Sequence, residues 1–182
     1  MNPPGTYRES NGAVVSGKEA LDAWSGAAIA VLRDTARRYN DTITYASLGK
    51  QVQECTGIRT RRLLMHWIGK VLGQVANTCH SANEVWLTSL CVHTDGTVGA
   101  GYAGAVADAD GTSPPDSELH AAGQRLLCYR KYADDLPADG GTPSLTRQEA
   151  ARRRAAQPAP APKTCPVHHT TLPRTGQCDE CR

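Results

Sequence analysis

Two pairs of potential metal ligands lie close together near the C-terminus. They constrain the fold of the C-terminal segment more strongly than any other sequence feature constrains its own region. Two residues separate Cys165 from His168, two separate Cys178 from Cys181, and nine separate the pairs. A two-residue gap lets one tight turn direct two ligands at one ion, so two such turns complete a tetrahedral site. Because residues 164–182 are too few to bury a core, metal binding would supply their folding energy. The spacing predicts a zinc ribbon or knuckle.

Two points of this prediction have alternatives: which histidine supplies the nitrogen ligand, and whether the segment binds a metal. His169 directly follows His168 and competes with it as the fourth ligand. A disordered tail with incidental cysteines is the simpler interpretation of the same residues. Four protein ligands close the coordination shell and leave no position for a reacting water. We therefore expect the cofactor to be a structural Zn(II) rather than a catalytic one.

Outside this tail, few residues suggest chemistry. Cys79-His80 and Cys91-x-His93 are two further cysteine–histidine pairs, which would form a second metal site only if the fold brought them together. Cys91 and His93 would also make a nucleophile and its base, but no third group is apparent to orient the histidine. No carboxylate pair, Ser–His–Asp set or phosphate-binding loop supports an enzyme. We expect no catalytic residue.

The net charge of +2 conceals an alternation of sign along the chain. Residues 24–80 carry 8 basic and 3 acidic side chains, residues 81–143 carry 3 and 9, and residues 144–182 carry 7 and 3. Two basic blocks around an acidic one indicate a polyanionic partner. Most of the basic residues are arginine, whose planar donor fork suits phosphate or guanine. A genome whose GC-rich codons favour arginine is the alternative explanation.

The sequence also bears on the compartment. No apolar run approaches the roughly 18 residues that a membrane-spanning helix needs. Residues 1–9 lack the basic and then apolar order of a signal peptide. Seven cysteines, an odd number, in a chain without an export signal favour reduced thiols or metal ligands over disulfides. We expect a cytoplasmic protein that contacts no membrane and is nucleoid-associated if it binds DNA.

Local signals predict a mainly helical chain. Ser16 with Glu19 forms a capping box, Thr44 can cap a second helix, and Gly57 is a natural helix end. Apolar residues recur at helical spacing between these signals and beyond them. Ile58-Arg59-Thr60 would make a tight link before the third helix. The predicted helices cover about 18–39, 45–56, 60–80 and 117–133, and Thr146 opens a short basic helix through Arg154.

One small β-hairpin interrupts the helices. Residues 85–93 form a strand-like run, Asp95-Gly96 is a tight-turn signal, and residues 97–102 can return as the second strand. The order helix, short strand, helix, helix and hairpin is that of a winged helix-turn-helix. The predicted organisation is a flexible arm at 1–15, a winged-helix-like domain with an additional helix at 16–140, a basic helix and Pro-Ala linker at 141–163, and the zinc ribbon at 164–182.

The third predicted helix begins in a cluster of basic residues. In a winged helix-turn-helix this helix enters the major groove of DNA by its N-terminal end, where backbone N–H groups also favour phosphate. Double-stranded DNA is the expected partner. The alternative is an ordinary solvated face paired with acidic residues such as Glu54. The candidate DNA-binding residues are Arg59, Thr60, Arg61, Arg62, His66 and Lys70.

Two stretches carry a resemblance to a known family. Thr42-Ile-Thr-Tyr-Ala-Ser-Leu-Gly49 and Asp95-Gly-Thr-Val-Gly-Ala-Gly-Tyr-Ala-Gly104 are similar to segments of the C-terminal winged-helix domain of alkylguanine-DNA alkyltransferases and alkyltransferase-like proteins. The resemblance covers residues 24–104 and implies a winged-helix fold and DNA binding. Residues 87–93 lack the family's Pro-Cys-His-Arg motif, so alkyl transfer is not implied. The whole architecture also resembles uncharacterised actinobacterial and actinophage proteins that join this domain to a zinc ribbon.

Three functions compete at this point. The first is a non-enzymatic DNA-binding protein that uses the winged helix, with a structural zinc ribbon adding contacts. The second is a protein–protein adaptor whose ribbon and linker bind a partner while the acidic segment at 108–139 faces a basic surface. The third, an enzyme that acts on modified bases, has the least support. Burial of Arg59, Arg61 and Arg62 against carboxylates would remove the case for DNA binding.

Overall fold

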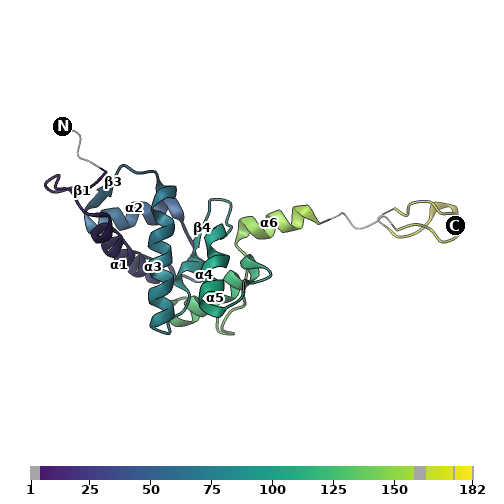
Figure 1. The fold of residues 1–182 in the computed structure, drawn as a ribbon. Helices are drawn as coiled ribbons and strands as arrows, with labels where there is room; N and C mark the ends of the chain where they lie inside the picture. The colour runs from purple at the N-terminus through teal and green to yellow at the C-terminus, as the bar shows by residue number, and fades with distance from the viewer. Residues whose placement is uncertain (1–4, 158–162, 174, 182) are drawn as a thin grey trace. The chain divides into compact units, whose positions relative to one another are not determined.

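The computed structural model describes residues 5–157, 163–173 and 175–181 of the chain (Figure 1). The chain divides into two compact units, Met1–Ala150 and Ala151–Arg182. Over the described residues the structure is mainly helical, as predicted, with four short strands in two separate two-stranded sheets. None of the helices in the described ranges is both long enough and apolar enough to cross a membrane.

Three helices build the core of the first unit. Helix α1 covers Gly17–Thr35, α2 covers Tyr45–Thr56 and α3 covers Ile68–Ser81, and α1 packs against both of the others. Apolar residues at helical spacing put one buried stripe on each helix, which is why the three faces close around one core. The fully buried residues of these stripes include Ala28, Leu32, Leu48, Val52, Val71 and Val75.

The predicted start of α1 and both predicted ends of α2 are confirmed, whereas α1 ends at Thr35 and not at the predicted residue 39. The Ser16 side chain accepts a hydrogen bond from the Glu19 N–H at 3.1 Å, and the Thr44 hydroxyl accepts one from Ser47 N–H at 3.1 Å. Each satisfies a backbone donor that the first helical turn leaves unpaired. Gly57 ends α2 with a φ of 63°, a left-handed conformation that glycine adopts without steric cost.

Two segments that the sequence predicts as an arm and a link instead form a sheet. Strand β1 (Thr6–Arg8) pairs antiparallel with β3 (Ile58–Thr60), with Tyr7 opposite Arg59. Arg61 N–H continues the contact by donating to the Gly5 carbonyl at 3.0 Å. Part of the predicted flexible arm is therefore held by the segment that follows α2, a pairing between distant residues that local sequence signals do not encode.

The predicted hairpin is wrong, although its turn forms. Around Asp95-Gly96, His93 N–H donates to the Thr97 carbonyl at 2.8 Å. The preceding strand β4 (Cys91–Val92), however, pairs in parallel with β2 (Ile43–Thr44). The chain after the turn enters helix α4 (Ala100–Asp110) instead of returning as a strand.

Side-chain acceptors explain why the second strand of the hairpin does not form. The Val98 N–H donates to a Glu118 carboxylate oxygen at 2.8 Å, and the Gly99 N–H donates to the Tyr45 hydroxyl at 3.1 Å. These donors are therefore not free for a strand ladder. Beyond Gly99, the alanine-rich sequence of α4 suits a helix.

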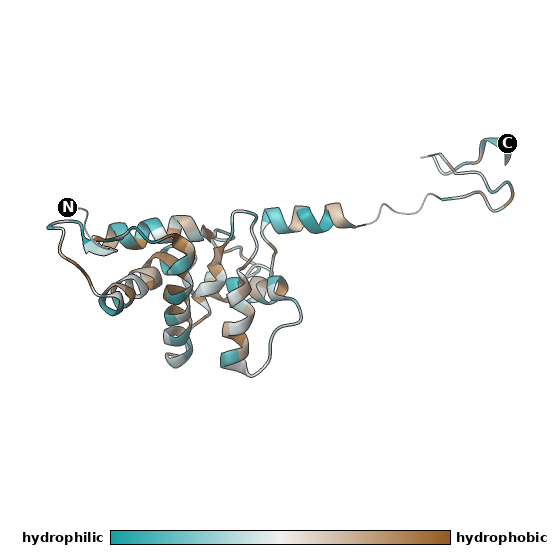
Figure 2. Ribbon diagram, turned by 45° about the horizontal axis from the view of Figure 1, so that its top comes forward, coloured by the Kyte–Doolittle hydropathy of each residue, from teal (hydrophilic) through white to brown (hydrophobic). Residues whose placement is uncertain are grey.

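The last two helices complete the described fold. Helix α5 (Ser117–Tyr132) confirms the predicted fourth helix, and its N-terminus is capped by the Asp116 carboxylate. The short helix η2 (Leu87–Leu90) is buried and packs against α5. Helix α6 (Arg147–Ala156) confirms the predicted basic helix and is mostly hydrophilic (Figure 2). The Thr146 hydroxyl accepts from Glu149 N–H at 3.3 Å, as its capping role predicts.

A carboxylate after α3 ties α1 and α5 together. One Glu84 oxygen forms an ion pair with Arg33 at 3.3 Å and accepts from the Tyr132 hydroxyl at 3.0 Å, while the other contacts the Lys131 ammonium. Burial alone would raise the pKa of Glu84, but the hydrogen bonds from Lys131, Val85 N–H and Tyr132 lower it to about 2. The ionised side chain therefore stabilises the folded state.

We expect Glu84→Gln to lower the free energy of unfolding at pH 7 by about 2 kcal/mol, since solvent screens the exposed Lys131 and Arg33. A carboxyl whose pKa is depressed by folding stabilises above its unfolded-state pKa and loses this effect as pH falls towards the folded value. The difference should therefore shrink between pH 5 and pH 2. Urea unfolding across this range measures it.

Glu54→Gln is the matched control, because Glu54 makes an exposed ion pair with Lys50 at 3.8 Å. Exposed pairs of this kind contribute little, so the control should change stability by less than about 0.5 kcal/mol. Equal effects of the two substitutions would contradict the assigned role of Glu84.

Candidate metal centre and candidate nucleic-acid surface

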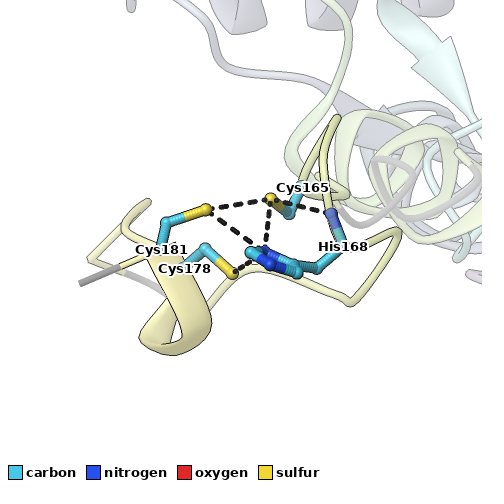
Figure 3. A group of neighbouring side chains, drawn as sticks. All are labelled: Cys165, His168, Cys178 and Cys181. Atoms are coloured by element: carbon cyan, nitrogen blue, oxygen red, sulfur yellow. Dashed lines mark hydrogen bonds between the residues drawn. The ribbon is translucent and has the colours of Figure 1, made fainter.

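The four predicted metal ligands converge in the second unit. Figure 3 shows the three sulfur atoms and the imidazole of His168 directed towards one another. His168 Nδ1 lies 3.8 Å from Cys165 Sγ, 3.6 Å from Cys178 Sγ and 3.3 Å from Cys181 Sγ. The Cys165 and Cys181 sulfurs are 3.6 Å apart, and all four ligand atoms lie within 4.8 Å of one another.

Two short turns bring the ligands together. Cys165 directly follows Thr164, which forms an antiparallel bridge with Thr171, and the chain turns back with His169 at a φ of 54°. The second pair is closed by the short helix η3 (Asp179–Cys181), in which Cys181 N–H donates to the Cys178 carbonyl at 3.2 Å. Each two-residue gap is therefore closed by a local turn, as the spacing predicts.

The ligand set fits a tetrahedral ion. With metal–sulfur bonds of about 2.3 Å and metal–nitrogen bonds of about 2.0 Å, tetrahedral ligand atoms lie roughly 3.5–3.8 Å apart. The separations of 3.3–3.8 Å in the structure lie close to this range. The cluster contains His168 and not the adjacent His169, which settles the geometric choice between them. These four residues are thus close enough to bind a metal ion.

Backbone donors favour ionised sulfur in this cluster. N–H groups of His168 and then Val167 lower the pKa of Cys165, and the Glu180 N–H lowers the pKa of Cys178. The neighbouring Cys165 thiol raises the pKa of Cys181 to about 11. Because thiolates are the metal-binding form of cysteine, two of the three sulfurs are already biased towards coordination, and a cation would remove the repulsion among them.

The other cysteine–histidine pairs do not form such a site. Cys79 and Cys91 are buried while His80 and His93 are exposed. In the described residues, no group of three or more potential ligands other than the C-terminal cluster lies within reach of one ion. Burial also raises the pKa of the Cys91 thiol to about 12. Cys91 is therefore protonated and enclosed at neutral pH, which disfavours it as a nucleophile.

The candidate DNA-binding residues do not open a helix as predicted. Arg59 and Thr60 belong to β3, a short 3-10 helix η1 covers Leu64–His66, and α3 starts only at Ile68. The expected contribution of a helix N-terminus at Arg59–Arg62 is therefore wrong. The reason lies in the pairing of β3 with β1, which holds the backbone extended up to Thr60.

Two of these residues have structural roles. Arg59 forms an ion pair with Glu9 at 3.0 Å, so its charge is already neutralised. Thr60 N–H donates to the Gln53 side chain at 2.8 Å, and the Thr60 hydroxyl accepts from Arg62 N–H at 3.2 Å. Thr60 therefore shapes the loop, whereas the predicted contact residues Arg61, Arg62, His66 and Lys70 are all exposed.

An apolar groove between α3 and α4 was missed by the sequence analysis. Its volume is about 400 Å³, and Tyr45 and Thr88 are among the residues that line it. Thr88 is 8% exposed, and its hydroxyl has no hydrogen-bond partner among the described residues. The groove could not be predicted because residues 97–102 were expected to form a strand, whereas α4 begins at Ala100. The lining also includes Ile68, Leu72, Ala76, Ala100, Tyr102 and Ala105.

Comparison with known proteins finds no match, since no protein-family model, no curated protein and no solved structure corresponds to this chain. The similarity to alkyltransferase domains and the winged-helix assignment accordingly remain predictions from the sequence.

We expect purified protein to carry one metal ion per chain, and Cys178→Ser or His168→Ala to reduce that stoichiometry to near zero. His169→Ala is the matched control, because His169 lies outside the cluster and should leave the stoichiometry unchanged. Elemental analysis of the three variants measures the outcome. Full metal retention by His168→Ala would contradict the assignment of its nitrogen as a ligand.

Proposed function

We propose that this chain is a non-enzymatic protein that binds double-stranded DNA. The binding surface would be the basic segment, defined as residues 61–70 with the exposed side chains Arg61, Arg62, His66 and Lys70. The C-terminal cluster would hold a structural Zn(II). The proposal goes beyond the geometry, which supplies an exposed cationic surface and a set of metal ligands.

The observation that carries the proposal is the contrast between paired and unpaired cations. Arg61, Arg62 and Lys70 occur in none of the ion pairs found in the described part of the chain. Half of the 14 Lys and Arg residues of the first unit do have a carboxylate partner. The paired ones are Arg8, Lys18, Arg33, Arg37, Lys50, Arg59 and Lys131.

The sequence around the basic segment supports an anionic partner. No Asp or Glu occurs between Glu54 and Glu84. Arg61 and Arg62 therefore face solvent from a stretch without nearby acidic neighbours in the chain, and Arg61 also lies 6.0 Å from the centre of the Tyr7 ring. Such exposed guanidinium groups suit phosphate oxygens, and their fork geometry suits guanine as well.

The helix pair α2 and α3 is the element that would present this segment. Their order, with α1 packed behind both, is that of a helix-turn-helix, although β3 and η1 make the connection longer than the usual turn. We propose that the connection itself, rather than a helix tip, meets the duplex. A β-hairpin wing would take no part, because β4 pairs with β2 and the chain after the turn enters α4.

Zinc in the second unit would act as a structural cross-link. A Cys3His set closes the coordination shell, so a bound ion supplies folding energy and no reacting water. The folded ribbon would then add contacts to DNA beside the basic helix α6, which contains the exposed residues Arg152 and Arg154.

An adaptor is the second candidate function. It is favoured by the division of the chain, since the second unit contains the metal cluster and an exposed Val167 that no core covers. In this reading the ribbon and linker hold a protein partner. The test compares capture of a protein partner by two variants of the full chain. Capture that persists without Arg61 and Arg62 but is lost without Cys178 would support the adaptor.

We expect Arg61→Gln plus Arg62→Gln to weaken binding to duplex DNA of any sequence, because two phosphate contacts are lost. The slope of log K against log salt concentration should become less negative by about 0.9 for each contact. Fluorescence anisotropy with a labelled random duplex across a salt series measures both effects.

Lys18→Gln plus Arg37→Gln is the matched control, since it removes the same charge from exposed residues already paired with Asp22 and Asp134. This control should retain most of the wild-type affinity and slope. Equal losses in both double variants would show that net charge alone governs binding, and would overturn the assignment of the surface.

A further inference from the structure

Two large apolar side chains protrude from the basic segment. Leu63 is 64% exposed and Met65 is 78% exposed, and both flank the half-buried Leu64. We call residues 63–65 the apolar turn. Large hydrophobic residues that are this exposed are few in the described part of the chain, and two of them are separated here by a single residue. Two such residues on one short turn form an exposed apolar patch, which needs an explanation.

The apolar turn is held from behind. Leu64 packs over Gly49 of α2, so closely that a Cβ on Gly49 would lie 2.5 Å from the Leu64 methyl carbon and 3.3 Å from the Trp67 ring. Backbone hydrogen bonds also close the turn, from His66 N–H to the Leu63 carbonyl at 2.9 Å and from Trp67 N–H to the Leu64 carbonyl at 3.1 Å. Leu63 and Met65 are therefore displayed by an anchored turn rather than by a loose loop.

Cationic groups surround the apolar turn. Arg61 and Arg62 precede it, His66 and Lys70 follow it, and none of the four forms an ion pair in the described residues. A partner that matches this pattern has dense negative charge outside and stacked apolar surface inside. Duplex DNA has both, in its phosphates and in its base stack.

We propose that Leu63 and Met65 form a wedge that inserts between adjacent base pairs and kinks the duplex. This inference rests on the proposed function and specifies how the DNA is bound. The flanking arginines would hold the two phosphate backbones while the apolar side chains replace part of the stacking between two base pairs. Affinity would then depend on how readily a DNA step unstacks, without any hydrogen bond to a base edge.

A second copy of this chain fits the apolar turn less well. A two-fold interface would place the same patch on both partners, so Arg61 and Arg62 would face their own counterparts. Like charges brought together in this way oppose association. An anionic membrane surface shares part of the required chemistry and is therefore a separate outcome of the experiment.

The wedge predicts a preference among DNA sequences. Pyrimidine–purine steps such as TA kink and unstack easily, whereas A-tracts are stiff. The wild-type protein should bind a duplex with a central TA step about ten times more tightly than an A-tract duplex of equal length. Its salt dependence should be the same on both, because the phosphate contacts are shared.

The test uses full-length protein and a duplex with 2-aminopurine beside the central TA step. Binding of wild type should raise the fluorescence of this base several-fold as stacking is lost, and Leu63→Ser plus Met65→Ser should abolish the rise and the sequence preference. The double variant should keep the wild-type salt slope on the A-tract duplex. Both side chains are exposed, so circular dichroism and the melting temperature should remain unchanged.

Leu119→Ser plus Leu127→Ser is the matched control, because these leucines are exposed elsewhere, on α5. It should behave as wild type. Salt-dependent binding without a fluorescence rise, or an equal rise in the wedge variant, would overturn the wedge but leave DNA binding intact. Absence of duplex binding would overturn both proposals. Binding to phosphatidylserine vesicles that requires Leu63 and Met65, with no rise on DNA, would replace the wedge by a membrane contact.

Discussion

The contact between Trp24 and Trp67 determines where the rest of the first unit can lie. Their ring centres are 4.6 Å apart, and the Trp24 indole N–H donates to the Ile58 carbonyl at 3.0 Å. Without any phenylalanine in the chain, this pair supplies much of the bulky packing in the core. These two interactions join α1 to β3, which precedes the basic segment, and to Trp67, which lies within it, so the chain is held on both sides of residues 63–65.

Features encoded by neighbouring residues were predictable. The capping interactions of Ser16 and Thr44 and the left-handed Gly57 depend on a few adjacent residues, so sequence signals located these ends within a few residues. Helix α5 had a clear apolar periodicity and was also predicted. The metal ligands belong to the same class, because turns within Cys165–His168 and Cys178–Cys181 set most of their geometry.

Features that depend on distant pairing were not predictable. The sequence of residues 58–60 is that of a connecting loop, but these residues form a strand because β1 pairs with them. The following helix consequently begins only at Ile68. The turn at Asp95-Gly96 was predicted from local residues and does form. The Asp95 carboxylate accepts a hydrogen bond from Thr97 N–H at 3.0 Å. Its flanking strand nevertheless joins β2, whose sequence lies far away, so a correct turn led to a wrong hairpin.

The absence of a side chain at Gly49 has a consequence beyond packing. Because Leu64 and Trp67 occupy the space of a missing Cβ, the height at which the next residues stand above the surface is set from inside α2. A methyl group added at Gly49 would displace Leu64 and so shift the exposed Leu63 and Met65, although neither of these residues is itself substituted. The proposed contact surface is thus open to adjustment from the interior, by a buried residue that lies behind that surface.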